Sequence, residues 1–510
     1  MSTEVELKLT ARPADLPELR QALLAMAPDA VSSQERLVST YFDTQDLALK
    51  RRGLSFRVRE QAGRFVQTVK SADLTKLGAL SRGEWEDPLP DSRPDFAAPE
   101  SGAHLPEEVI SELHPLFVTD VTRAAFEIET LPGTRIEAAI DEGEIRSAGA
   151  EAAEPISEIE LELKIGEGAA LYDLALRLLE AAPIRIGPES KSERGYRLVA
   201  GAETAPQEVH AEPVVLDAET TVDTALREIG RNCLVQALRN EPAVLSAQPE
   251  GIHQMRVAMR RLRSAISSLK EMLSAEDRRW VDEELRWLGG ALGQARNFDV
   301  FATELLQTAR AGTPDEAGWE ELGETLDRLR QAAYDRVREA ILSKRYTATI
   351  IHLVRWFEAR GWQESVLSST PMGNIAPSVL DRRRHKLRQR SKGFSRLNPR
   401  ERQKLRIAAK KLRYTIELFG GLFDKSDLQI YTRKLKGLQD DLGYANDVRV
   451  AHDFLGELFA ELDPRGPAAR AWVGVLEWHD QRIAARERRL RKHLRRLTRA
   501  TPFWRDRKSS

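Results

Sequence analysis

Hydrophobic and polar positions follow two different periods along this chain, and the change falls near residue 200. Up to about residue 165, apolar and polar residues mostly alternate in short runs, a period of two that is typical of half-buried strands. Helical spacing interrupts this pattern at about 13–26 and 169–182, and the turn-rich stretch 88–106 predicts a surface loop. The pattern predicts an α+β domain built on an antiparallel sheet or barrel. The predicted strands cover residues 3–9, 37–43, 54–60, 64–70, 81–87, 123–130, 135–141 and 156–164.

Beyond residue 220 the apolar spacing is helical almost to the end of the chain, which predicts an all-α domain. The protein is therefore expected to be multidomain. We assign residues 1–202 to the strand-rich domain, 203–219 to a linker that contains Pro206 and Pro213, and 220–505 to the helical domain. Glycine and proline predict breaks between helices near 249–251, 289–293, 312–314, 371–377, 420–421 and 464–467.

The helical half also repeats itself weakly, at an offset of 150 residues. One shift explains two separated pairs of segments, which chance similarity between arginine-rich helices would rarely do. We predict two related subdomains, at about 220–365 and 375–505. The aligned pairs are HQMRVAMRRLR at 253–263 with QKLRIAAKKLR at 403–413, and LGQARN at 292–297 with LGYAND at 442–447.

Composition indicates the expected cellular location of the protein and shows how charge is divided along the chain. The chain has 510 residues, a net charge of −1 and one cysteine, Cys233, which cannot form an internal disulfide. The N-terminal sequence lacks the features of a signal peptide, and no window approaches the roughly 18 apolar residues of a membrane span, so we expect a cytoplasmic protein. Divided after residue 210, the net charge becomes −15 and +14, so the near-zero total conceals an acidic half and a basic half.

In the acidic half, charged residues gather on one side of the predicted strands. Side chains at alternate positions of a strand share a face, so Glu4, Glu6 and Lys8 lie together, as do the three glutamates and the lysine of 158–164. One hypothesis is a sheet with one packed face and one solvated face. The other is a sheet that closes with its charged face inward, because successive carboxylates repel unless a cation lies among them. Such a lumen would hold Mg²⁺ on carboxylates and phosphates on basic residues.

Nine sequence elements of this half, in order over about 200 residues, resemble the CYTH domain, the family of triphosphate tunnel metalloenzymes. The resemblance implies an eight-stranded antiparallel tunnel that binds a triphosphate together with a divalent metal. The elements are E-x-E-x-K at 4–8, YFDT at 41–44, R-x-R at 57–59, Lys70, ALSRGEWE at 79–86, Arg123, RIEAAIDEG at 135–143, EIELELK at 158–164 and SKSERGYRL at 190–198.

Carried over position by position, this resemblance implies roles for individual residues. Glu4, Glu6 and Lys8 form the implied catalytic set, and the metal, Mg²⁺ with Mn²⁺ as the alternative, is bound by carboxylates, with Glu84 or Glu86 in support. The implied metal ligands are Glu4, Glu6, Glu160, Glu162 and Asp141, and the implied triphosphate-binding residues are Lys8, Arg57, Arg59, Lys70, Arg123 and Lys191.

The expected chemistry is metal-assisted hydrolysis of a phosphoanhydride. One metal ion and the basic residues spread the charge of the transferring phosphoryl group, while a second metal ion or a carboxylate orients a water for in-line attack. Arginine suits this role because its planar fork pairs with two phosphate oxygens. Tyr41, Phe42 and Trp85 are interpreted as outer packing residues.

In the basic half, one helical stripe occurs twice. His253, Arg256, Arg260 and Arg263 stand at i, i+3, i+7 and i+10, and His253 is expected to titrate near neutral pH. An isolated stripe is usually a solvated helix face, whereas two copies favour a binding surface. The repeat copy is Gln403, Arg406, Lys410 and Arg413, and further basic clusters cover 381–413, with 15 basic and two acidic residues, and 481–510, with 12 and two.

This half resembles the CHAD domain, the conserved-histidine α-helical domain often found after CYTH. The motifs are IHQMRVAMRRLR at 252–263, LGxxRN at 292–297, LRIAAKKLRY at 405–414 and LQDDLGYAND at 438–447. The resemblance implies two four-helix bundles around a basic cavity or groove that binds inorganic polyphosphate. Gln403 stands where the family commonly has histidine, and Asn297 where it commonly has aspartate. The implied polyphosphate-binding residues are His253, Arg256, Arg260, Arg263, Arg406, Lys410 and Arg413.

The leading hypothesis is a cytoplasmic, Mg²⁺-dependent inorganic triphosphatase that hydrolyses tripolyphosphate to pyrophosphate and phosphate, with a C-terminal polyphosphate-binding domain. One alternative is a polyphosphate-binding or granule-associated protein with little turnover. Another is a CYTH enzyme that acts on thiamine triphosphate or nucleoside triphosphates. Nucleic-acid binding is disfavoured, because the basic stripe is poor in aromatic residues for base stacking.

Overall fold

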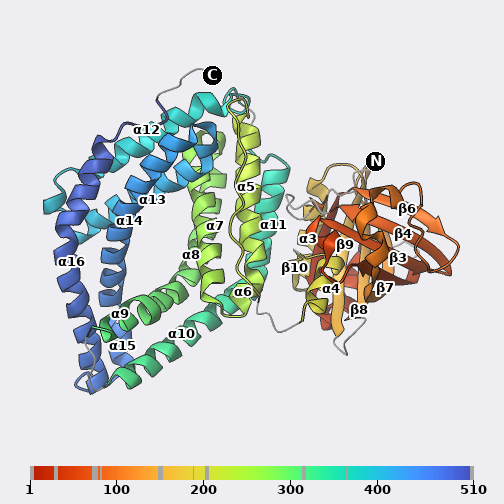
Figure 1. Cartoon of the computed structure of the whole chain (residues 1–510), viewed down its shortest axis with the longest axis horizontal. Coiled ribbons are helices and arrows are strands. Elements are labelled where there is room, and N and C mark those ends of the chain that lie inside the picture. Colours follow the sequence, from red (N-terminus) through yellow and green to blue (C-terminus); the bar gives the residue numbers. More distant parts are fainter. Residues whose placement is uncertain are drawn as a thin grey trace. The chain divides into compact units, whose positions relative to one another are not determined.

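The computed structural model describes residues 5–27, 33–71, 79–80, 83–147, 153–187, 189–201, 206–312, 318–362 and 365–505. The chain divides into two compact units (Figure 1). The first contains residues 1–207 together with 342–361, and the second contains 208–341 and 362–510. Among the described residues, no helix has both the length and the apolar character that a membrane span requires.

One antiparallel sheet builds the first unit (Figure 1). Nine strands follow the hydrogen-bonded order β10-β1-β9-β8-β7-β2-β3-β4-β6, and β5 pairs with β1 outside this order. The strands are β1 (Glu6–Ala11), β2 (Ser33–Asp43), β3 (Leu54–Gln61), β4 (Arg64–Ser71), β5 (Ala79–Leu80), β6 (Glu84–Leu89), β7 (His114–Leu131), β8 (Thr134–Ser147), β9 (Ala153–Ile165) and β10 (Ile184–Ile186).

The prediction of an eight-stranded barrel was wrong in its strand count. Within the described residues the sheet has ten strands, and the two additional ones, β5 and β10, have only two and three residues. The family resemblance implied eight strands, and the alternating pattern agreed with it because strands as short as β5 and β10 show no alternation. The described strands also do not form a closed hydrogen-bonded ring. Near one end of the sheet β5 pairs with β1, and at the other end β6 pairs with β4.

Apolar side chains of the sheet face the helices of the first unit. Leu7 and Leu9 of β1 and Ile159 and Leu161 of β9 are fully buried, as their alternation with charged residues predicts. The two predicted helices are present, with a 3-10 turn at Pro13–Asp15 preceding the first. The α-helices of the unit are α1 (Leu16–Met26), α2 (Ala48–Arg51), α3 (Ala169–Ala181), α4 (Lys191–Val199) and α11 (Lys344–Glu358).

Helix α11 belongs to the first unit although it lies between two stretches of the second unit in sequence. It packs on α3 and beside β10. The Arg355 guanidinium donates to both carboxylate oxygens of Asp173 on α3, at 2.6 and 3.1 Å, and Lys344 Nζ donates to the carbonyl oxygen of Glu180 at 3.3 Å. The first unit is therefore built from two separate stretches of chain.

The second unit is helical, as predicted (Figure 1). The segments aligned at an offset of 150 residues lie on α7 and α8 and on α13 and α14, and α7 packs against α13. The division into two four-helix bundles stays a prediction. The helices are α5 (Val222–Arg239), α6 (Glu241–Leu245), α7 (Pro249–Ser268), α8 (Ala275–Val300), α9 (Gln307–Arg310), α10 (Trp319–Leu342), α12 (Met372–Ser391), α13 (Pro399–Phe419), α14 (Lys425–Asp453), α15 (Leu455–Glu461) and α16 (Pro467–Arg499).

The helix break predicted near 289–293 was wrong, because α8 continues through Gly289, Gly290 and Gly293. A Cβ at Gly293 would lie 2.8 Å from Nη1 of Arg256 on α7, and the same Nη1 donates to the carbonyl oxygen of Gly289 at 3.1 Å. These glycines make room for an arginine that crosses the backbone of α8. Their cost in helix propensity is offset by helix packing.

Candidate functional site

A polar cavity of about 300 Å³ lies within the first unit. The structure brings ten of the eleven predicted site residues of this unit to its wall, and the eleventh, Glu4, lies outside the described residues. On each strand, the charged residues that reach the cavity occupy alternate positions, as expected of side chains that share one inward face. The ten residues are Glu6, Lys8, Arg57, Arg59, Lys70, Arg123, Asp141, Glu160, Glu162 and Lys191, and Glu84 and Glu86 join them.

One wall of the cavity carries carboxylates on β1 and β9. Glu6 stands directly opposite Glu162 in the strand pairing, and like charges at such positions destabilise a sheet. Glu6 Oε1 is buried without a hydrogen-bond donor, although Lys8 Nζ lies 3.2 Å away. A carboxylate oxygen that accepts no hydrogen bond and lies beside further carboxylates suits a hard cation such as Mg²⁺. Glu6 and Glu162, with Glu160 next to them on the same face, therefore offer a donor set that fits a divalent metal.

The deepest acidic cluster is neutralised by cations of the chain itself. Asp141, Glu158 and Glu160 bring carboxylate oxygens within 4.8 Å of one another. Lys191 Nζ lies 2.7 Å from Asp141 Oδ2 and 2.9 Å from Glu160 Oε1, and it also pairs with Glu158. Burial opposes the charge of Lys191, but the three carboxylates outweigh it and raise its pKa well above the usual value.

Besides the predicted metal binding, Asp141 positions a cation of the cavity, Arg123. Its two oxygens accept from Arg123 Nε at 2.7 Å and Nη2 at 2.6 Å, and its side chain is fully buried. Arg123 also pairs with Glu160. This bidentate pair fixes the guanidinium in the cavity wall. Glu158, which shares the inward face, was not predicted as a site residue, although its parity with Glu160 indicates it.

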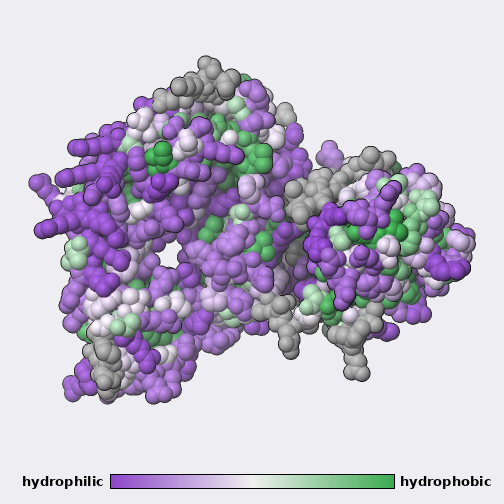
Figure 2. All heavy atoms as spheres, in the orientation of Figure 1, coloured by the Kyte–Doolittle hydropathy of each residue, from purple (hydrophilic) through white to green (hydrophobic). Residues whose placement is uncertain are grey.

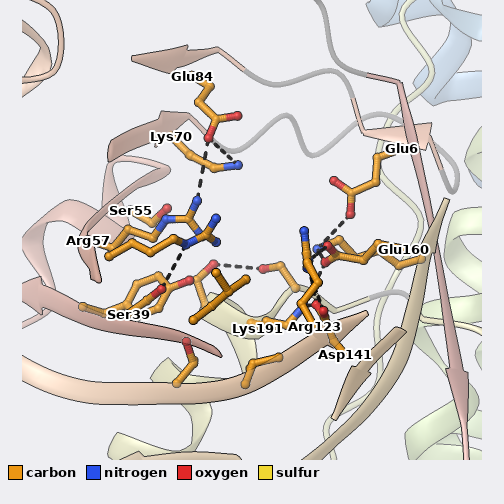
Figure 3. Close-up of a pocket in the computed structure, with 18 of the residues that line it drawn as sticks. Glu6, Ser39, Ser55, Arg57, Lys70, Glu84, Arg123, Asp141, Glu160 and Lys191 are labelled. Atoms are coloured by element: carbon orange, nitrogen blue, oxygen red, sulfur yellow. Dashed lines mark hydrogen bonds and ion pairs between the residues drawn. The ribbon is translucent and has the colours of Figure 1, made fainter. Parts of the chain in front are cut away.

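The facing wall carries Arg57 and Lys70, together with Glu84 (Figure 3). Lys70 Nζ lies 2.7 Å from Glu84 Oε1, and Arg57 Nη2 lies 3.8 Å from the same oxygen. Arg59 Nε donates to Ser39 Oγ at 3.3 Å, and the neighbouring Arg57, with burial, lowers the pKa of Arg59 to about 10. Arg57 Nε is buried without a partner. Two crowded guanidiniums with free donor capacity are poised to bind an anion.

Hydroxyl groups complete the cavity, and the sequence prediction missed them. Ser39, Tyr41, Ser55 and Thr119 line the wall. Tyr41 was interpreted as a packing residue; its ring does stack on Phe117 at 4.5 Å, but the residue also reaches the cavity. Ser39 and Tyr41 pair across strands with Arg59 and Arg57, so the parity test applied to 37–43 identifies both.

The interpretation of the other two aromatic residues holds. Trp85 stacks on His104 with ring centroids 3.6 Å apart, and Phe42 contacts Phe56 at 5.7 Å. Neither Trp85 nor Phe42 is among the residues that line the cavity. Both rings belong to the apolar packing around the sheet.

A second cavity, which we call the basin, has a volume of about 790 Å³ and lies among α7, α8, α13 and α14 in the second unit. The space-filling view shows an opening through this unit (Figure 2). Six of the seven predicted polyphosphate-binding residues line the basin. Arg413 does not: its Nε lies 3.6 Å from Glu417 Oε1, and its guanidinium lies over the ring of Tyr414 at 4.9 Å. The six are His253, Arg256, Arg260, Arg263, Arg406 and Lys410.

Cations crowd the basin strongly enough to disfavour their own charge. Burial, followed by Arg406 and Arg260, lowers the pKa of Lys410 to about 6, and burial with Arg260 lowers that of Arg256 to about 9. The expectation that His253 titrates near neutral pH was wrong, because burial and Arg296 lower its pKa to about 4. Such shifts arise where cationic groups are buried and like charges converge without enough counter-charge. Further basin residues that the prediction missed are Arg286, Arg296, Lys411 and Tyr414.

Comparison with known proteins gives matches for both halves. The model of the CYTH domain matches residues 2–196, and that of the CHAD domain matches 228–456. An inorganic triphosphatase of Haemophilus influenzae is 33% identical over 201 residues, which cover 39% of this chain and 55% of that protein. An uncharacterized protein of Mycobacterium tuberculosis is 28% identical over 338 residues, which cover 61% of each chain.

Solved structures give a match for the helical half. The crystal structure of the CHAD domain from the plant Ricinus communis is 28% identical, with a TM-score of 0.50, and the match covers 58% of this chain and 98% of that domain. The chain thus resembles a complete CHAD domain, but it spans less than two thirds of the length of the curated relatives.

Proposed function

The chain belongs to the proteins that carry a CYTH domain followed by a CHAD domain, and on this basis we propose that it is a metal-dependent inorganic triphosphatase. Its reaction would convert tripolyphosphate to pyrophosphate and phosphate in the cavity of the first unit. The helical unit would bind inorganic polyphosphate, and the protein would act in the cytoplasm. Similarity to an inorganic triphosphatase supports the reaction class.

One observation carries the catalytic proposal: the cavity has Glu6 and Glu160 on one side, and Arg57 and Lys70 on the opposite side (Figure 3). A triphosphate with a bound divalent metal presents both signs of charge. Its phosphate oxygens would pair with Arg57, Arg59 and Lys70, whereas its metal would face Glu6 and Glu162. At a surface that bound phosphate without a metal, the carboxylates would only repel the phosphate.

Individual residues would have distinct tasks in this reaction. Arg57, Arg59 and Lys70 would bind and orient phosphate oxygens, and Arg123, held by Asp141, would stabilise charge on the transferring group. Glu6, Glu160 and Glu162 would hold Mg²⁺ or Mn²⁺, which supplies charge neutralisation on the phosphates. Lys8, which contacts both Glu6 and Glu160, would keep these carboxylates in place.

A phosphate-release panel tests this proposal. The substrates are tripolyphosphate, long-chain polyphosphate, ATP and thiamine triphosphate, each with Mg²⁺, with Mn²⁺ and with a chelator. We expect metal-dependent turnover that is fastest on tripolyphosphate. Faster turnover of ATP or thiamine triphosphate would move the assignment to another triphosphate. No turnover of any of the four would contradict it.

The basin supports a second candidate function, that of a polyphosphate-binding or granule-associated protein with little turnover. Its cations exceed the acidic groups that line it, which are Asp282, Glu304 and Asp447. Binding by the full chain to long polyphosphate, measured beside the phosphate-release panel, separates the two. Tight binding with negligible turnover would favour this candidate, and competition with RNA would show whether the basin selects inorganic polyphosphate.

A further inference from the structure

The C-terminal part of α16 carries an outer surface of a single charge. Every exposed residue of this helix between 488 and 499 is arginine or lysine. On its inner side, Leu490, Leu494 and Leu497 are buried in the core formed with α12, α13 and α14. We call the six residues that surround a shallow groove on the outer side the α16 cationic face: Arg488, Arg491, Lys492, Arg495, Arg496 and Arg499.

The face lacks the counter-charges found elsewhere in this unit. Arg491 has an acidic partner, Glu487, at 3.5 Å, whereas the other five have no acidic group within ion-pair distance among the described residues. Cations four residues apart on a helix repel, and this spacing occurs at 488 and 492, 491 and 495, 492 and 496, and 495 and 499. The pattern therefore weakens the helix unless an anion binds there.

Helix α10 shows that the pattern is not a general property of long helices in this unit. It is also long and amphipathic, but it mixes both signs, with acidic residues that include Glu324, Asp327, Asp335 and Glu339. Neighbouring Asp441 pairs with Arg489 and His493 on the flank of α16, so acidic partners are available to this helix. Among the described residues, Asp441 does not pair with any of the six residues of the α16 cationic face, and of these six only Arg491 has an acidic partner.

We propose that the α16 cationic face is a second anion site, separate from the basin, that binds the extended chain of a long inorganic polyphosphate. The six residues span about 16 Å along the helix axis, so a linear polyanion aligned with the helix meets all of them. Exposed aromatic side chains, which nucleic-acid bases would require for stacking, do not occur between 488 and 499. The inference rests on the proposed polyphosphate binding and assigns the binding of long chains to the α16 cationic face.

The test uses the full chain and compares two triple variants. The first, Arg491→Gln with Arg495→Gln and Arg499→Gln, removes three charges from the face. The second, Arg328→Gln with Arg336→Gln and Arg338→Gln, removes three exposed charges from α10 as a matched control. Affinities for long-chain polyphosphate, tripolyphosphate and single-stranded RNA are measured over a range of salt, with circular dichroism as a check on folding.

We expect the α16 variant to bind long-chain polyphosphate at least about tenfold more weakly and to lower the salt slope by about two, since each lost phosphate contact removes roughly 0.7. Its turnover of tripolyphosphate should not change, and the control should resemble the wild type. Arginine-to-lysine substitution at the same three positions should retain most of the affinity.

Three results would overturn the inference. Unchanged binding of long polyphosphate by a folded α16 variant would remove the site, while leaving the proposed enzyme and basin intact. RNA that binds the wild type more tightly than polyphosphate, and loses more affinity in the variant, would make the face a nucleic-acid surface. A wild-type chain that binds polyphosphate of no length would instead contradict the proposed function itself.

Discussion

At the scale of single residues, both cavities depend on charges placed where they are unfavourable without a ligand. Glu6 faces Glu162 across two strands, and Arg57 lies beside Arg59 with a free Nε. In the basin, Lys410 is surrounded by arginines on its own helix and on α7. A protein tolerates such pairs when a ligand of opposite charge relieves them, as expected of functional sites.

The first prediction concerns Glu6. Glu6→Gln should lower the rate of phosphate release from tripolyphosphate roughly 100-fold, because it removes a metal-facing carboxylate. In the absence of metal it should raise the melting temperature slightly, since the repulsion with Glu162 disappears. The control is Glu127→Gln, which alters an exposed carboxylate outside the cavity. Full activity of Glu6→Gln would show that this carboxylate has no part in the reaction.

The second prediction concerns the pH dependence of the basin. In the empty protein the pKa of Lys410 is about 6, against 10.5 for a free lysine, so a bound polyanion that restores the charge takes up a proton. Affinity for polyphosphate should rise as pH falls from about 8 to about 6, by up to about tenfold per pH unit. For the same reason the empty protein gains stability as pH rises from about 6 towards 10.5.

Lys410→Arg keeps its charge throughout this range and should flatten the dependence of affinity on pH. Lys404→Arg, on an exposed position of the same helix, should leave it unchanged. The groups that set the pKa of Lys410 are Arg260 on α7, Arg406 and Arg413 on α13, and Asp447 on α14. Identical slopes for the wild type and Lys410→Arg would exclude Lys410 as the group that titrates.

At the scale of elements, two helices position the cavity from outside the sheet. Helix α4 begins at Lys191, with Ser190 and Glu193 forming a capping box, and so carries the lysine to the acidic cluster. It packs on β7 and β8. Helix α11 covers α3, next to the edge strand β10, and β10 pairs with β1. The sheet carries most of the charged groups, and these helices fix its geometry.

The third prediction concerns the approach of α4 to the sheet. A Cβ at Gly195 would lie 2.1 Å from the ring of Phe117, which is fixed between Tyr41 and Tyr196. Gly195→Ala should therefore destabilise the first unit by about 1–3 kcal/mol and lower activity by displacing Lys191. Gly168→Ala, where a Cβ meets no atom within 4 Å, is the control. Thermal unfolding and turnover measure both effects, and a wild-type melting temperature in Gly195→Ala would contradict the packing argument.

The fourth prediction concerns α11. A fragment of residues 1–207 lacks this helix, and we expect it to melt at a lower temperature than the same fragment joined by a flexible linker to residues 342–361. The apolar face that α11 covers would otherwise be exposed to water. A fusion to α12, residues 372–391, provides a helix of similar length from the second unit. Equal melting temperatures for the three proteins would show that α11 is dispensable.

At the scale of the whole molecule, we expect the two units to bind anions by different means. The cavity of the first unit has walls of both signs, which suits a small anion that carries its own cation. The basin and the α16 cationic face are predominantly positive, which suits a polymer of negative charges. The net charges of −15 and +14 in the two halves reflect this difference.

The fifth prediction is that these functions can be separated. Arg260→Gln combined with Lys410→Met should weaken binding of polyphosphate at least about tenfold and leave turnover of tripolyphosphate unchanged, because the substituted groups lie only in the basin. Glu6→Gln should do the opposite. Equilibrium binding and phosphate release, measured on the same preparations, give the answer. Loss of both functions in either folded variant would indicate that the units depend on each other.

Local patterns in the sequence determined much of this protein. Alternation on strands such as 158–164 identified which charged residues share a face, because side chains of a strand alternate whatever the sheet does. The spacing of 253–263 and 403–413 identified the stripes that line the basin, because helical periodicity is equally local. Family motifs added the residues that lie on different strands, such as Arg123 and Lys191.

Tertiary structure decided what depends on contacts between distant segments. The strands β5 and β10 are too short for a periodic signal, and the glycines of α8 permit the passage of Arg256 where a break was expected. Burial among arginines, which no local pattern reveals, lowers the pKa of His253 to about 4. Sequence alone thus fixed which residues share a face, whereas packing decided which faces meet and which charges remain unpaired.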